Sequence, residues 1–167
     1  MKRSELLGLA RRFLAIPTAP YHEHGVRAAV EAECRALGLA PQRDRAGNVL
    51  VKRGRRRGAP LVLVAHMDHP AFAVVGERRL EFLGNVPREM FVGSRVRVGM
   101  TVARITRVVS ERSAVRELEV NRPVRGEFGM WELPPVAVRA GKLHGPSIDD
   151  VLGAVVLLAT LREAGGP

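Results

Sequence analysis

The chain has 167 residues, of which 46% are hydrophobic, so it can bury a core and is too apolar to be intrinsically disordered. Its formal net charge is +10, but lysine occurs only at Lys2, Lys52 and Lys142, and aromatic residues make up 4%. An arginine-rich composition with so few base-stacking side chains argues against nucleic acid as the partner.

Neither a disulfide-linked fold nor a membrane span is expected. Cys34 is the single cysteine, so no internal disulfide can form. The longest apolar stretch, Val151 to Leu161, is about half the length that a membrane-spanning helix needs. The start of the chain does not resemble a signal peptide, because Glu5, Arg11 and Arg12 interrupt its apolar residues. We therefore predict a cytoplasmic protein.

Two amphipathic helices are predicted at the start of the chain. Residues 4–16 place leucines and Phe13 at helical spacing, with Ser4 as a candidate N-cap and Pro17 as the stop. A second helix is expected over residues 23–37, ending at Gly38, because glycine readily adopts the left-handed conformation that closes a helix.

A pair of strands is predicted next, over residues 48–51 and 61–64. The second run, Leu-Val-Leu-Val, is uniformly apolar, as in a central strand covered on both faces. The dense arginine run over residues 53–58 lies between the two strands and is interpreted as a solvated turn. Together these segments indicate the central part of a sheet.

The hydrophobic pattern of the sequence changes over residues 74–135. Short valine-rich runs alternate apolar and charged residues between glycine and proline breaks, as in residues 95–98 and 102–109. This alternation predicts half-buried antiparallel strands in a small sheet or barrel. A strongly apolar helix is then predicted over residues 148–164, ended by Gly165, Gly166 and Pro167.

His66 and Asp68 follow the apolar run directly, at the carboxyl end of the predicted strand, where open α/β sheets build their sites. A neutral imidazole nitrogen of His66 is a suitable metal ligand. Asp68 faces the same side of an extended chain and could hold that ring in one tautomer. A histidine and a carboxylate that satisfy each other at a strand end are the alternative, and the two residues alone leave both readings open.

Asp149 and Asp150 stand where the last predicted helix begins, with Ser147 as a candidate cap. The helix dipole stabilises carboxylates there, so capping alone accounts for them and is favoured when the segment is taken by itself. If Ser147 caps the helix, however, one carboxylate is spare, and a carboxylate can bridge two metal ions.

Taken together, the two segments resemble the pattern of two-metal aminopeptidases and deacylases, in which a strand ends in HxD and a later aspartate opens a helix. Several details are similar to the glutamyl and tetrahedral aminopeptidases, some of which are described as endoglucanases. They are the opening PTAPYHEHGVRAAVEAECRALGL from Pro17, the D-x-x-G-N pattern of residues 44–48, AHMD at 65–68, and IDDVLG at 148–153. The resemblance covers nearly the whole chain but only the N-terminal portion of a typical member.

The resemblance implies an α/β fold, with a mixed β-sheet flanked by helices and an inserted small β-barrel-like domain. The α/β domain would comprise residues 1–75 and 136–167, and the inserted domain residues 76–135. His66 and Asp149 lie 83 positions apart, and the family carries its inserted domain in this interval. Aminoacylase-type deacylases carry their extra domain later, so the spacing argues against that sister reading.

The resemblance further implies hydrolysis of N-terminal residues from peptides by two divalent metal ions, zinc or cobalt. His66 would bind one ion, Asp149 would bridge both, and Asp68 would join the catalytic set by orienting His66. Asp150, His69 and His144 are secondary candidates. Family members often assemble into large oligomers, so a homo-oligomer is expected besides the peptide substrate.

The sequence departs from the family pattern in several places. The Glu-Glu pair that provides the general base and a ligand is not found, nor are the later aspartate and histidine; His69 replaces a usual glutamate and Val151 a usual arginine. Whether the chain is an enzyme therefore stays open, and alone it is expected to be inactive. The alternatives are a non-catalytic interaction or assembly module, an aminoacylase-type deacylase and, least favoured, a basic nucleic-acid-binding module.

Overall fold

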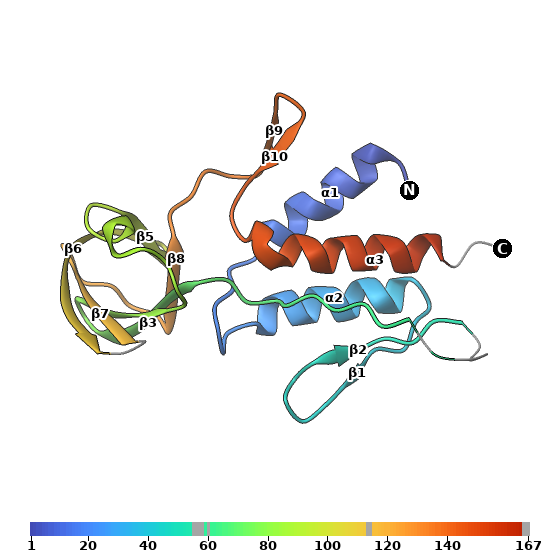
Figure 1. The fold of residues 1–167 in the computed structure, drawn as a ribbon, viewed down its shortest axis with the longest axis horizontal. Helices are drawn as coiled ribbons and strands as arrows, with labels where there is room; N and C mark the ends of the chain where they lie inside the picture. The colour runs from blue at the N-terminus through green and yellow to red at the C-terminus, as the bar shows by residue number, and fades with distance from the viewer. Residues whose placement is uncertain (55–58, 60, 113–114, 165–167) are drawn as a thin grey trace.

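The computed structural model describes residues 1–54, 59, 61–112 and 115–164, and divides them between a helical part and a β-barrel (Figure 1). The helical part contains α1 (Arg3–Leu14), α2 (His24–Ala36) and α3 (Gly153–Glu163). The N-terminus and the C-terminal end of α3 lie at the side of the helical part that faces away from the barrel (Figure 1). The three predicted helices are thus present, although the regular part of the last one begins at Gly153.

The helix ends agree with the sequence in one place and differ in another. Gly38 closes α2 with a φ of +73°, and the N–H of Leu39 donates to the carbonyl of Cys34 at 2.9 Å, as the left-handed helix ending requires. Ser4 was expected to cap α1, but it lies inside the helix. Glu5 performs the capping instead, because its Oε2 accepts the N–H of Lys2 at 3.2 Å.

A single apolar cluster holds the three helices together. Its buried residues include Phe13 and Leu14 of α1, Val26 of α2, Val155 of α3, and Val151 just before α3. Burying such side chains removes apolar surface from water, which is the main favourable contribution to folding. Met67, Val136 and Leu143 pack against the same cluster, so segments distant in sequence are fixed to the helices.

The barrel is closed by six antiparallel strands in the order β3-β4-β7-β6-β5-β8. Their bounds are β3 (Ala71–Gly76), β4 (Arg79–Leu83), β5 (Arg95–Val98), β6 (Thr101–Arg112), β7 (Val115–Val120) and β8 (Phe128–Trp131). A short 3₁₀ helix, η1 (Arg88–Met90), joins β4 to β5. The antiparallel barrel expected from the alternating valine-rich runs is confirmed.

The barrel has its own core, separate from that of the helices. Alternate residues of β5, Val96 and Val98, point inward, while Arg95 and Arg97 are exposed, as period-two alternation predicts. Phe72, Phe82 and Phe91 form the centre, with the Phe82 and Phe91 rings 4.8 Å apart in an edge-to-face arrangement. Such aromatic pairs add to the stability that burial provides.

The predicted central sheet, in which residues 48–51 and 61–64 form neighbouring strands, is not found in the described residues. Val49–Leu50 forms β2, but its partner is β1 (Gln42–Arg43) and not residues 61–64. Residues 61–64 have no strand partner among the described residues, and Leu61 and Val64 are 86% and 84% exposed. An apolar run is buried as a central strand only where neighbouring strands cover it. Every strand pair in the described residues is antiparallel, so they form no mixed sheet.

A two-stranded hairpin leads from the barrel back to the helices. It consists of β9 (Ala137–Arg139) and β10 (Lys142–His144), and it projects beside α1 in Figure 1. Residues 55–58 of the arginine run and the predicted stop at residues 165–167 lie outside the described residues. Within the described residues, no helix has the length and apolar character needed to cross a membrane.

Candidate functional site

The candidate site is centred on the imidazole ring of His66, which lies between two carboxylates. Its Nδ1 is 3.1 Å from Oδ1 of Asp68, and its Nε2 is 3.3 Å from Oδ1 of Asp149. The second contact joins residues 83 positions apart. The fold therefore brings together three of the residues that the sequence singled out.

The local chain direction explains why His66 and Asp68 meet. Residues 66 and 68 flank Met67, whose side chain packs against the apolar cluster of the helices. In an extended chain alternate side chains point to opposite sides, so with Met67 directed inward its two neighbours share the outward side. The His66 and Asp68 side chains accordingly remain partly exposed, at 52% and 36%.

Asp149 and Asp150 do not sit at a regular helix start. They belong to a π-helical turn, η2 (Ile148–Leu152), in which both have non-helical backbone angles and are joined by a cis peptide bond. Asp149 projects from this turn with its side chain 93% exposed. The turn, and not the first turn of α3, is what presents the Asp149 carboxylate to His66.

The expected capping role of Ser147 is wrong. Ser147 has a left-handed backbone, with φ +53°, and makes no capping hydrogen bond. Its hydroxyl is buried and has no partner in the described part of the chain. An N-cap normally has extended backbone angles that aim its side chain at the first free N–H groups. The left-handed conformation of Ser147 does not provide that direction.

The secondary candidates are placed differently. Nδ1 of His69 lies 3.2 Å from the backbone carbonyl of Asp149, so His69 borders the site through the main chain. The Asp150 carboxylate lies against Gly153 at the start of α3. His144 is exposed at the end of β10, five positions before Asp149.

The electrostatic setting of His66 favours its protonated form. Burial is the largest single influence and lowers the pKa of His66, but the Asp68, Asp149 and Asp150 carboxylates together outweigh it, so the pKa lies above its usual value. A ring held between two carboxylates by hydrogen bonds is also restricted in orientation. The same arrangement leaves Nε2 directed at Asp149.

His66 and Asp149 are the side chains that could hold a metal ion. With Nδ1 engaged by Asp68, Nε2 is the ring nitrogen left for coordination, and Oδ1 of Asp149 is on the same side. A catalytic zinc ion usually has three protein ligands. Among the described residues no group of three or more histidine, cysteine, aspartate or glutamate side chains could hold a metal. The residues present thus fit part of a metal centre and do not complete one.

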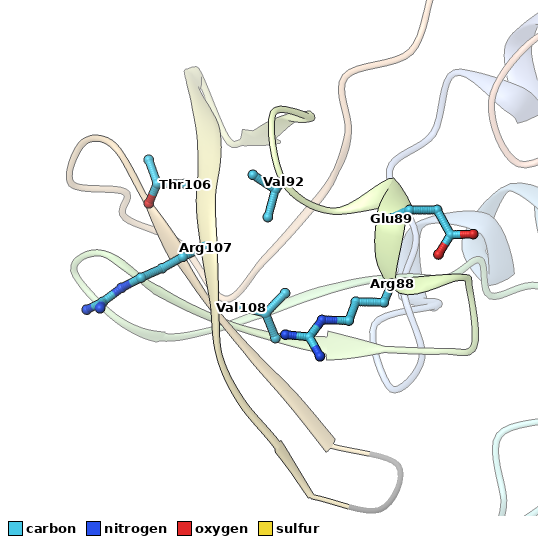
Figure 2. Close-up of a pocket in the computed structure, with 6 residues that line it drawn as sticks. All are labelled: Arg88, Glu89, Val92, Thr106, Arg107 and Val108. Atoms are coloured by element: carbon cyan, nitrogen blue, oxygen red, sulfur yellow. The ribbon is translucent and has the colours of Figure 1, made fainter.

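An open pocket of about 520 Å³ lies elsewhere, on the barrel (Figure 2). It is lined by residues of η1, of the loop between η1 and β5, and of β6, namely Arg88, Glu89, Val92, Thr106, Arg107 and Val108. None of the residues predicted for the site lines it. Its mixed lining of charged and valine side chains does not bring together groups for hydrolytic chemistry, so we place the candidate site at His66.

Sequence reasoning did not single out Thr18, which contacts the site from the loop between α1 and α2. Its Oγ1 donates a hydrogen bond to the backbone carbonyl of Met67 at 2.7 Å. A side chain that binds a main-chain carbonyl 49 positions away leaves no pattern in the local sequence. A small polar residue between Pro17 and Ala19 is ordinary loop composition.

Comparison with solved structures shows the fold. An aminopeptidase from the archaeon Desulfurococcus kamchatkensis matches with a TM-score of 0.74 and 19% identity, over 96% of this chain and 52% of that one. A TET protein solved as a dodecamer matches with a TM-score of 0.72 and 21% identity, over 99% of this chain and 57% of that one. An endoglucanase from Thermotoga maritima matches with a TM-score of 0.72 and 22% identity, over 94% and 55% of the two chains.

The chain therefore shares its fold with part of the aminopeptidase, the TET protein and the endoglucanase. The chain spans about half the length of the solved chains that it matches. No protein-family model and no curated protein matches the sequence. Sequence identities this low show a shared fold alone. The function is therefore inferred from the residues of the His66 site.

Proposed function

We propose that the chain forms part of the active site of a metal-dependent aminopeptidase, with His66 and Asp149 as metal ligands and Asp68 as the residue that orients His66. The main support for this proposal is the geometry of the His66 ring, which contacts Asp68 through Nδ1 and faces Asp149 with Nε2. A histidine ligand whose second nitrogen is held by a carboxylate is the usual arrangement in metal sites. The shared fold with aminopeptidases supports the same reading.

The proposal includes two divalent ions, zinc or cobalt, and a peptide as the substrate. Bound ions of this kind polarise a carbonyl group and lower the pKa of a bound water. Because His66 and Asp149 are fewer ligands than a catalytic ion needs, we propose that polypeptide outside the described residues supplies the others, together with the general base. The two-residue set explains why this chain alone is proposed to be inactive.

We also propose that the protein acts in the cytoplasm as a homo-oligomer. One solved protein of this fold is a dodecamer, and the exposed apolar residues 61–64 give this chain a surface that association would cover. A non-catalytic assembly module is the second candidate function. It is supported by the same exposed segment, and by the two-residue ligand set in the described part of the chain.

The test is zinc and cobalt binding by the full chain, measured by calorimetric titration and elemental analysis, in the unmodified protein and in His66→Ala and Asp149→Ala variants. We expect each substitution to weaken binding by more than about 10-fold, since each removes a direct ligand. His24→Ala is the matched control, because His24 is an exposed histidine at the start of α2 and lies outside the site. Its binding should equal that of the unmodified chain.

The outcomes separate the two candidate functions. Unchanged binding in both His66→Ala and Asp149→Ala would remove these residues from the metal site. Complete absence of metal from the unmodified chain, with concentration-dependent self-association, would favour the assembly module. Metal binding that depends on both residues would justify an assay of amino-acid p-nitroanilide hydrolysis in the longest protein that carries this sequence.

A further inference from the structure

Thr18 is a fully buried polar residue in the loop that joins α1 to α2, with 0% exposure. The loop contacts both the barrel and the segment that carries His66. Its next residue, Ala19, is equally buried, and the ring of His22 stacks on Phe128 of the barrel with the ring centres 4.8 Å apart. The loop is thus packed on one side against strand β8.

The hydroxyl and the N–H of Thr18 donate hydrogen bonds to two different parts of the molecule. Its Oγ1 donates to the backbone carbonyl of Met67 at 2.7 Å, and its N–H donates to Sδ of Met130 in β8 at 3.3 Å. The first bond reaches the site and the second reaches the barrel. Thr18 therefore connects the barrel to the residue that separates His66 from Asp68.

The Met67 carbonyl belongs to the peptide unit that leads into Asp68. Residues 66–69 form no strand ladder in the described structure, and the Thr18 hydroxyl donates to this carbonyl instead. A peptide unit is planar, so fixing its oxygen also fixes the direction in which the next residue leaves it. The Met67 side chain, packed in the helical core, holds the same unit from its other side.

We propose that Thr18 is a positioning residue for the site: its buried hydroxyl orients the Met67–Asp68 peptide unit and thereby holds the Asp68 carboxylate against the His66 ring. This role rests on the proposed function, in which His66 is a metal ligand oriented by Asp68. Through the N–H contact with Met130, the position of Thr18 also depends on the barrel. The barrel thus helps to set the geometry of a site whose described side chains, His66, Asp68 and Asp149, lie outside it.

The test compares Thr18→Val, which keeps the shape and removes the hydroxyl, with Thr18→Ser, which keeps the hydroxyl. The full chain is labelled with ¹⁵N-histidine, and the two ring nitrogens of His66 are observed by NMR in alkaline buffer, where the ring is neutral. In the unmodified chain we expect Nδ1 to carry the proton, because Asp68 accepts it. Thr18→Val should shift both nitrogens toward the values of a freely tautomerising imidazole, and Thr18→Ser should restore the original shifts.

The His24 and His144 resonances are internal controls, since both side chains are exposed. A substitution that merely loosened the fold would move them as well and would not be rescued by serine. Identical His66 shifts in Thr18→Val and the unmodified chain would overturn the inference. If Thr18→Val does not fold, the hydroxyl proton of Thr18 in the unmodified chain decides: we expect slow exchange with water, and exchange as fast as that of an exposed threonine would overturn the proposal.

Zinc titration of the same samples separates this inference from the proposed function. If zinc leaves the His66 resonances of the unmodified chain unchanged while Thr18→Val shifts them, His66 is not a ligand and the positioning by Thr18 stands. If zinc shifts the His66 resonances equally in the unmodified chain and in Thr18→Val, and the metal-free spectra coincide, the proposed ligand role stands and the positioning role is wrong.

Discussion

The carboxylate of Asp150 occupies the space into which a side chain at Gly153 would project. A Cβ built on Gly153 would lie well inside van der Waals contact with Oδ1 of Asp150. Gly153 is the first residue of α3, and its φ of −59° is ordinary, so the need for glycine comes from this contact and not from backbone conformation. The glycine thereby fixes where the irregular turn around Asp149 and Asp150 ends.

Gly153→Ala is expected to destabilise the protein by about 1–3 kcal/mol, because the added methyl group must displace the Asp150 carboxylate. The measurement is urea unfolding followed by circular dichroism. Gly8→Ala is the matched control: Gly8 lies within α1, and a Cβ there meets nothing within 4 Å. It should stabilise the protein by about 0.5–1 kcal/mol. Equal stabilisation by both alanines would contradict the packing argument.

Asp68→Asn is expected to weaken zinc binding by about 10–100-fold while leaving the thermal melting temperature nearly unchanged. The reason is that Asp68 accepts a hydrogen bond from Nδ1 of His66 and is itself partly exposed. Calorimetric titration measures the affinity. Glu89→Gln removes one exposed carboxylate on η1 and controls for the change in net charge. Equal losses in the two variants would mean that Asp68 acts only through long-range charge.

Phe82→Ala is expected to destabilise the barrel by about 3–5 kcal/mol, since it removes a buried ring from the centre of the barrel core. Met100→Ala, at a 94% exposed residue between β5 and β6, should change stability by less than about 0.5 kcal/mol. Both values come from denaturant unfolding. If the helices unfold at the original denaturant concentration in Phe82→Ala, the two parts of the molecule unfold independently.

Glu31 provides a prediction about pH. Its buried carboxylate accepts hydrogen bonds from Arg43 and Arg35; the Arg43 bond is the main reason that the pKa of Glu31 lies below its usual value, and burial opposes the shift. A depressed pKa contributes stability that is complete above the pKa of the unfolded chain, at about 4.3, and is lost as the pH falls through the lower folded pKa. Glu31→Gln should therefore be less stable than the unmodified chain at neutral pH.

That difference should shrink as the pH is lowered below about 4, because the unmodified chain then loses the same charge. Thermal melting across this pH range measures it. A difference that stays constant down to the lowest pH would show that the glutamine disturbs packing and that the ion pairs with Arg35 and Arg43 contribute little.

Val62→Lys combined with Val64→Lys is expected to reduce self-association of the chain. Both valines lie in the exposed run 61–64, which has no strand partner in the described residues, and charged side chains prevent such segments from pairing with other chains. Light scattering coupled to gel filtration over a range of concentrations measures the effect. Met100→Lys, at an exposed residue on the barrel, should leave association unchanged. A monomer at all concentrations in the unmodified chain would contradict the expectation.

The sequence predicted those features that depend on local periodicity. The helical spacing around Phe13 and the alternation around Val96 identified α1 and the barrel, because each pattern reflects one buried face. The meeting of His66 with Asp68 follows from their spacing in an extended chain. The prediction that His66 meets Asp149 rested on a family resemblance, because residues 83 positions apart leave no local pattern.

Other features depend on what surrounds a segment. The apolar run 61–64 reads as a central strand, yet burial requires neighbouring strands that the described residues do not provide. Ser147 has the composition of a cap, but its left-handed backbone rules that function out. The bond from Thr18 to Met67 and the contact of Asp150 with Gly153 join particular atoms in three dimensions, and no periodicity records them.

The first and last strands of the barrel, β3 and β8, are hydrogen-bonded neighbours, with Phe72 opposite Gly129. The chain therefore enters and leaves the barrel at almost the same place. A module attached in this way can be deleted, exchanged or enlarged by joining two adjacent ends, without threading the remainder of the fold differently. Evolution can thus replace the barrel with another domain, provided that the new domain still packs against the loop around Thr18.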